Sequence, residues 1–195
     1  WAGLGAVGGF EGPEGGPRLG QAMLKGFKGG PFQGVAVEVL HRFMGDDVPR
    51  ERLEAMVDEA YASFSHDEIA PLSQLGEGQY FLELYHGQTL AFKDVAMQLL
   101  ARLMDDALIR RGARATIIGA TSGDTGGAAI EAFRGREAVD VFILFPDGRV
   151  SDVQRKPMTN PKDPKVHTLA VEGTFDDSQA LVKEMFTHAP FHPPQ

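Results

Sequence analysis

The sequence contains no cysteine among its 195 residues, which excludes disulfides, thiolate catalysis and zinc sites built on cysteine. It also has no apolar run approaching the ~20 residues that span a membrane, and no segment of the signal-peptide type. Basic residues are scarce, with 19 lysines and arginines against 27 aspartates and glutamates and a net charge of −8. This balance argues against nucleic acid or an anionic membrane as the main partner. We expect a cytoplasmic protein that acts on a small molecule.

The remaining composition is that of a globular protein, 43% hydrophobic and 24% charged. The length predicts one domain, or a domain with a small additional unit, and does not predict an oligomeric state. Residues 1–34 hold 12 of the 24 glycines, so we predict loop or disorder there. The first residue is Trp1 rather than methionine, and we therefore expect a fragment of a longer protein.

Residues 35–78 are predicted to form an N-terminal helical unit. The stretch "FQGVAVEVLHRFMG" has apolar residues at helical spacing and a glycine stop at Gly45. A second helix is predicted in "DDVPRERLEAMVDEAYASF", with Asp47 as its N-cap and Pro49 in its first turn. The stretch "APLSQLGEGQ" is interpreted as a connector to the next unit.

Residues 79–195 alternate between buried strands and helices, which predicts parallel βαβ units. The fold class is therefore α/β, with a parallel sheet that binds ligands at the carboxyl ends of its strands. Thr174 and Asp177 have the spacing of a capping box at the last helix. Two apolar stripes are expected on the helix at 94–111, at positions 95/99/103 and 96/100/104. Strands are expected at residues 80–86, 115–121, 139–145 and 165–173, and helices at 94–111, 125–135 and 174–188.

Lys93 stands where the strand at 80–86 and a polar turn lead into a helix. The field at a helix N-terminus disfavours an ammonium there by ~0.3–1 kcal/mol and favours the neutral amine that a Schiff base requires. The dipole alone is too weak, so burial beside Phe92 and Leu90 would have to supply most of the effect. The alternative is a solvated lysine that pairs with Asp94 or points to water.

A second strand-to-helix turn, "GATSGDTGG", combines glycines with hydroxyl side chains. Backbone N–H groups at such a turn bind anions, and glycine lets a ligand approach the chain. Because the Asp124 carboxylate would repel a doubly charged phosphate, we expect a substrate carboxylate at Thr121 and Ser122 and the cofactor phosphate elsewhere. The alternative is an ordinary N-cap by Ser122 or Asp124. Parallel strands would bring this turn and Lys93 to one edge of the sheet. His188 and His192 have i, i+4 spacing, but the prolines around them exclude the helix that would pair them on a metal, and no metal site is predicted.

These two stretches together resemble the threonine synthases, enzymes of the tryptophan-synthase-β-like fold (fold type II) that depend on pyridoxal 5'-phosphate (PLP). "ELYHGQTLAFKDVAMQ" is similar to the cofactor-lysine segment of that family, and "GATSGDTGGAAIEAF" is similar to its polar loop in the long-chain class. The resemblance extends over residues 33–186. It departs at Gln88, where the family pattern has proline, and losing that fixed φ would loosen the turn before Lys93.

The resemblance implies that Lys93 holds PLP as a Schiff base, with Phe92 and Asp124 as further cofactor contacts. It implies that Ser122, Gly123 and Thr125, together with Thr121, bind the substrate. The implied reaction is a carbon–oxygen lyase step of threonine biosynthesis that converts O-phosphohomoserine and water to L-threonine and phosphate.

The same resemblance predicts that the chain is C-terminally incomplete, with residues 79–195 forming part of a PLP-binding domain. We find no candidate in the sequence for the PLP phosphate loop or for the partner of the pyridine nitrogen. Activity of this chain alone is therefore in doubt. Two alternatives stay open, namely another PLP lyase of this fold (a serine or threonine dehydratase, or a β-replacement enzyme) and a non-catalytic fragment.

Overall fold

A computed structural model describes residues 15–188 of the chain. The chain divides into two compact units, Trp1–Ala55 and Met56–Gln195, and helix α3 passes from one to the other. Within residues 15–188, no helix is long and apolar enough to cross a bilayer.

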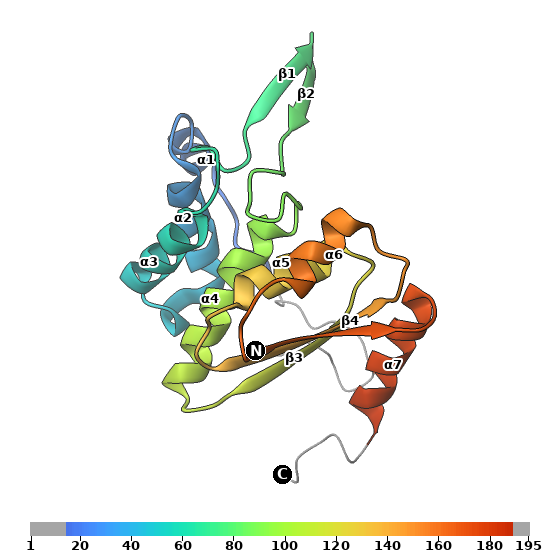
Figure 1. Cartoon of the computed structure of the whole chain (residues 1–195). Coiled ribbons are helices and arrows are strands. Elements are labelled where there is room, and N and C mark those ends of the chain that lie inside the picture. Colours follow the sequence, from blue (N-terminus) through green and yellow to red (C-terminus); the bar gives the residue numbers. More distant parts are fainter. Residues whose placement is uncertain (1–14, 189–195) are drawn as a thin grey trace. The chain divides into compact units, whose positions relative to one another are not determined.

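The described part of the first unit is helical (Figure 1). Helix α2 is the one expected from the sequence, but α1 and the start of α2 lie where loop or disorder was predicted. Helix α3 begins one residue after Pro49, whose carbonyl accepts the N–H groups of Arg52 and Leu53 at 3.0 Å. The predicted N-cap at Asp47 is therefore wrong, because Asp47 ends a short 3-10 turn. The elements are α1 (Gln21–Gly26), α2 (Phe32–Met44), η1 (Gly45–Asp47) and α3 (Arg50–Tyr61).

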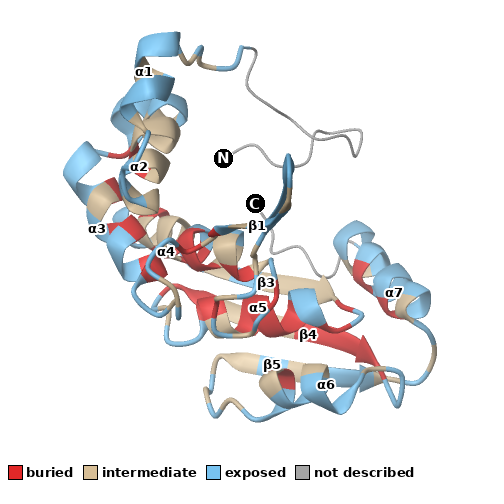
Figure 2. Cartoon of the chain, turned by 90° about the horizontal axis from the view of Figure 1, so that it is seen from above, coloured by how far each residue is buried: buried red, intermediate tan, exposed pale blue. Residues whose placement is uncertain are grey.

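The second unit contains a three-stranded parallel sheet in the order β3-β4-β5, which confirms the predicted α/β class with a parallel sheet. Strand β4 lies in the middle and is the most buried strand (Figure 2). Helix α5 contacts β4, while α7 contacts β3 and β4 from the other side of the sheet (Figure 1). The elements are α4 (Asp94–Arg110), β3 (Ala115–Ala120), α5 (Asp124–Phe133), β4 (Val139–Pro146), α6 (Asp152–Thr159), β5 (Val166–Val171) and α7 (Phe175–Thr187).

The hydrophobic core lies between the sheet and the helices α4, α5 and α6. Phe133, Val141 and Met158 are among its fully buried members. Helix α4 contributes Met97, Ala101, Met104 and Leu108, a face at i, i+4, i+7 and i+11. Neither predicted stripe coincides with this face, and of their residues only Met104 belongs to it. The sequence period was right, but α4 carries apolar residues around so much of its circumference that its orientation was not determined.

The strand expected at residues 80–86 is not part of the parallel sheet. Strand β2 (Gln79–Leu82) instead pairs antiparallel with β1 (Leu72–Gly76), in the stretch predicted as a connector. Gly78 takes the positive φ of 69° that the tight hairpin turn requires. All four β2 residues are exposed in the described structure. The strand leading to Lys93 was therefore wrongly placed, because a short apolar run does not reveal its pairing partner.

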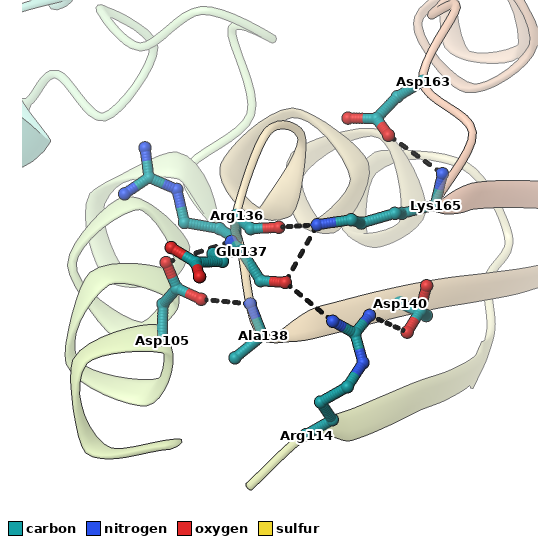
Figure 3. Close-up of polar contacts among 8 residues, drawn as sticks. All are labelled: Asp105, Arg114, Arg136, Glu137, Ala138, Asp140, Asp163 and Lys165. Atoms are coloured by element: carbon teal, nitrogen blue, oxygen red, sulfur yellow. Dashed lines mark hydrogen bonds and ion pairs between the residues drawn. The ribbon is translucent and has the colours of Figure 1, made fainter. Parts of the chain in front are cut away.

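A polar network fixes the connection from α5 to β4 (Figure 3). The buried Asp105 carboxylate accepts the backbone N–H of Ala138 at 2.8 Å and that of Glu137 at 3.3 Å. Lys165 donates from its Nζ to the carbonyls of Arg136 at 3.0 Å and Glu137 at 2.8 Å. The main chain at these residues is therefore held from α4 on one side and from the start of β5 on the other.

Candidate active site

A tight turn, residues 87–93, delivers Lys93 to the start of α4. Leu90 has a φ of 62°, a left-handed conformation that costs energy in a residue other than glycine. Its N–H nevertheless bonds the Gly87 carbonyl at 3.2 Å, which closes the turn. Lys93 is the N-cap of α4, and its carbonyl accepts the N–H of Met97 at 2.9 Å. The position of Lys93 at a helix N-terminus is thus as the sequence predicted.

Asp94, the next residue, holds this turn from within. Its side chain is fully buried, and it accepts the N–H of Thr89 at 2.8 Å and the Thr89 hydroxyl at 2.7 Å. Burial raises the pKa of Asp94, and the Thr89 hydrogen bonds oppose that rise. Gly87 packs directly on Asp94, since a Cβ at Gly87 would lie 2.4 Å from the Asp94 Cβ. The carboxylate therefore ties the turn to the helix and leaves no room for a side chain at position 87.

The amine of Lys93 lies beside an aromatic ring, with its Nζ 4.6 Å from the centre of the Phe92 ring. Such a contact is attractive for an ammonium. Phe92 and Leu90 are themselves 56% and 68% exposed, so they do not bury the lysine. The expectation that these two residues would supply a buried environment is wrong for the described structure, in which their side chains face outward.

The stretch before Lys93 is anchored at His86. Its Nε2 lies 2.7 Å from the Glu83 carboxylate, and its carbonyl accepts the Ser65 N–H at 2.9 Å. Hydrogen bonds from Ser73 and His86 lower the pKa of Glu83. These contacts connect the base of the β1–β2 hairpin to the segment that follows α3.

The second predicted turn, between β3 and α5, is shaped by Thr121. This buried side chain accepts with its Oγ1 the N–H groups of Gly123 at 3.0 Å and Gly126 at 2.9 Å. Gly123 is the N-cap residue, with a φ of 146° that favours glycine. The alternative prediction, an N-cap by Ser122 or Asp124, is wrong, because Thr121 is the side chain that caps the start of α5. A substrate contact by Thr121 stays a prediction, while the exposed side chains of Ser122 and Thr125 are open to a ligand.

Gln154 is a site residue that sequence reasoning missed. From the first turn of α6, its Nε2 donates to the Asp124 Oδ1 at 2.8 Å. The side chain also covers Gly123, where a Cβ would lie 2.5 Å from the Gln154 Cδ. Ser151 caps α6 by accepting the N–H of Gln154, and this Ser-x-x-Gln spacing was a readable signal. The prolines that follow, one of them inside the helix at Pro157, obscured it.

The two turns meet at a small cavity of about 50 Å³. Thr89 from the lysine turn lines it together with Gly123, Asp124 and Gln154. Lys93 is not among the lining residues. The two turns lie close together at Thr89 and Gly123, as expected, but the predicted cause, two neighbouring parallel strands, was wrong. They are brought together by the packing of α4 against α5, and not by neighbouring parallel strands.

Comparison with known proteins gives a consistent assignment. Residues 1–61 match the family model described as the N terminus of threonine synthase. Over 190 residues, 97% of the chain, the sequence is 45% identical to the threonine synthase of Pseudomonas aeruginosa. The structure overlays 97% of the chain on a PLP-bound threonine synthase from Brucella melitensis, with a TM-score of 0.92 and 53% identity. The chain matches the N-terminal portion of the threonine synthase family.

The yeast threonine synthase structure gives the same result, with a TM-score of 0.91 and 38% identity over 97% of the chain. The chain covers 40% of the Pseudomonas protein and 41% and 40% of the Brucella and yeast structures. It thus spans about 40% of the length of the relatives it matches.

Within residues 15–188, no group of three or more histidine, aspartate and glutamate side chains could hold a metal ion.

Proposed function

We propose that this chain forms the N-terminal part of a PLP-dependent threonine synthase, which converts O-phosphohomoserine and water to L-threonine and phosphate. The observation that carries the proposal is the position of Lys93 at a helix N-terminus, on a turn that the buried Asp94 holds and whose Thr89 lines one cavity with Gly123. The matching relatives named threonine synthase support the same reaction.

The side chains of the lysine turn have the chemical groups that PLP requires. Lys93 is partly exposed, so its amine is accessible to an aldehyde, and the Phe92 ring beside it can adjoin a flat heterocycle. PLP, when bound, supplies an electron sink that allows protons to leave carbons next to the substrate amine. Lys93 would hold the cofactor covalently, and its free amine would accept and return protons at the substrate carbons.

The turn between β3 and α5 fits an anionic substrate group. Ser122 and Thr125 present exposed hydroxyls, and the N–H groups at the start of α5 carry the positive end of the helix dipole. We propose that Ser122, Gly123 and Thr125 bind the substrate, and that Thr121 keeps the turn in shape. Asp124, oriented by Gln154, would orient a polar group on the cofactor or substrate.

Covalent labelling tests this proposal. The chain is incubated with PLP and reduced with borohydride, and the modified peptides are identified by mass. We expect a pyridoxyl adduct at Lys93 that is lost in Lys93→Arg and unchanged in Lys183→Arg, a control in the exposed part of α7. Adducts spread over surface lysines with none concentrated at Lys93 would contradict a specific PLP site in this chain.

The reaction is tested separately from cofactor binding. Phosphate release from O-phosphohomoserine, with threonine as the second product, would support a threonine synthase. A keto acid formed from serine or threonine would instead indicate a dehydratase of the same fold. Labelling at Lys93 without either product would show that these residues form the lysine site but require further parts of the protein for turnover. A cytoplasmic location remains a prediction.

A further inference from the structure

A second polar cavity, of about 320 Å³, lies between α4 and the C-terminal end of α5. Its walls include Gln98 and Arg102 from α4, and Arg134 and Arg136 from the end of α5 and the residues that follow it. Gln88, which stands where the resemblance leads one to expect proline, also lines it. Lys93 and the turn at 121–126 do not line it, so this cavity differs from the one where the two turns meet, although Gln88 belongs to the lysine turn.

Two guanidinium groups in this cavity share one carboxylate oxygen. Glu59 Oε1 lies 3.1 Å from Arg102 Nε and 3.0 Å from Arg136 Nη2. The side chains of Arg102 and Arg136 are only 10% and 23% exposed, whereas Glu59 is 53% exposed. Burial lowers the pKa of Arg102, and the charge of Arg136 acts in the same direction. Two poorly hydrated cations are therefore balanced by one well-hydrated carboxylate.

Several buried donors in the same place have no acceptor. Gln98 is 2% exposed, and its Nε2 makes no hydrogen bond to any described residue. Its amide orientation is set by its Oε1, which accepts from Arg102 Nη1 at 2.9 Å. The Nε atoms of Arg102 and Arg136 also lack a hydrogen bond of normal geometry within residues 15–188, although Arg102 Nε is ion-paired with Glu59. Buried donors without acceptors are costly, so this cluster calls for a group rich in acceptors.

The cluster is rigid enough to form a site. Figure 3 shows that the carbonyl of Arg136 is held by Lys165, while the guanidinium of Arg136 extends away from that lysine. Arg102 is fixed by its bonds to the Gln98 carbonyl at 2.7 Å and to the Gln98 side chain. At the far wall, Glu131 and Arg134 pair with each other, so that end is close to neutral. The excess positive charge lies at Arg102 and Arg136.

We propose that this cavity binds a small oxyanion, such as inorganic phosphate or a carboxylate, through Gln98 Nε2, Arg102 and Arg136. An ionised oxyanion offers only acceptors, which matches the donors that Gln98 Nε2, Arg102 and Arg136 offer. Water would satisfy some donors, but Glu59 supplies one negative charge for two guanidiniums, so one positive charge would stay uncompensated. The volume accommodates phosphate with room for a small organic substituent.

Phosphate binding is measured without PLP, at constant ionic strength maintained with chloride, by calorimetry and by the NMR signal of the Gln98 side-chain amide. Acetate is titrated in parallel to distinguish a carboxylate preference from a phosphate preference. We expect saturable binding that shifts the Gln98 signal and raises Tm by mass action. Gln98→Met and Arg102→Met should each weaken binding about tenfold or more, because each removes a hydrogen bond to a charged group.

Gln98→Met is the decisive variant, since methionine has similar length and good helix propensity and removes a buried donor that lacks an acceptor. It also removes the Oε1 acceptor of Arg102 Nη1, but that nitrogen keeps its bond to the Gln98 carbonyl at 2.7 Å. Its ligand-free Tm should stay close to that of the unmodified chain while phosphate affinity falls. Arg155→Met, which removes an arginine paired with Asp152 on the surface of α6, should leave affinity unchanged. The proposal is refuted if neither anion gives saturable binding above chloride, or if Gln98→Met and Arg155→Met bind equally well. Labelling at Lys93 does not depend on this result.

Discussion

Gly87→Ala is expected to disrupt the turn that presents Lys93. The new Cβ would lie 2.4 Å from the Asp94 Cβ and 2.5 Å from its Oδ2, where carbon atoms normally approach to about 3.5–4.0 Å. Asp94 is fully buried, so it can move only by breaking one or both bonds to Thr89. Overpacking costs about 1–3 kcal/mol and a lost hydrogen bond to a charged group about 1.5–3 kcal/mol.

A lower chain entropy of the unfolded state offsets up to about 1 kcal/mol of that cost. We therefore expect a net destabilisation of about 2–4 kcal/mol, measured as the shift of the urea midpoint at constant m. Borohydride-reduced PLP labelling at Lys93 should fall in parallel. Gly34→Ala is the matched control, because a Cβ there meets nothing closer than Pro31 at 3.6 Å in helix α2. An unchanged midpoint with unchanged labelling in Gly87→Ala would refute the role assigned to Asp94.

Three further substitutions test neighbouring parts of the fold. Asp94→Asn should remove part of the pH dependence of stability. Burial raises the native pKa of Asp94, so the contribution of Asp94 to the free energy of unfolding is largest in acid and is lost as pH rises through that raised pKa. Urea midpoints measured from about pH 3 to 7 would reveal this change. Thr121→Val should destabilise the fold by about 2–4 kcal/mol, because valine keeps the shape of the side chain but leaves two N–H groups without their acceptor. Thr121→Ser should recover more than half of that loss in the same denaturation assay. Thr174→Ala should lower the free energy of unfolding by about 1 kcal/mol and speed amide exchange in the first turn of α7, because the capping box loses its hydroxyl. Amide exchange at an unchanged rate would count against the cap.

The elements predicted well from the sequence are those whose signals are local. The apolar period of α4 and the apolar runs of β4 and β5 predicted the type and extent of these elements. The capping box of Thr174 and Asp177 marked the start of α7, and the structure has both of its hydrogen bonds. In each case the sequence signal lies within a few neighbouring residues, even where the strand pairs with residues distant in the chain.

The features that were missed depend on partners distant in sequence. Strand β2 was expected in the parallel sheet, but its type of pairing is decided by β1, and residues 80–86 alone do not reveal it. Gln154 reaches Asp124 across 30 positions, so nothing near either residue indicates the contact. Asp94 shows the opposite case, because its bond to Thr89 is local but its complete burial, which gives the bond its importance, follows from tertiary packing.

Hydrogen bonds within this chain fix the backbone of the lysine turn, whereas the apolar side chains around the turn stay exposed. Asp94 and Thr121 hold their turns with hydrogen bonds made entirely within the second unit, so residues of this chain fix the backbone around Lys93 and Gly123. Leu90 and Phe92 remain more than half exposed, and so do Tyr80 and Leu75 in the hairpin before them. Exposed apolar groups next to a prearranged site are typical of a surface that another part or partner covers. Placement of the amine should therefore survive in this chain, whereas exclusion of water from it requires a cover that the described residues do not supply.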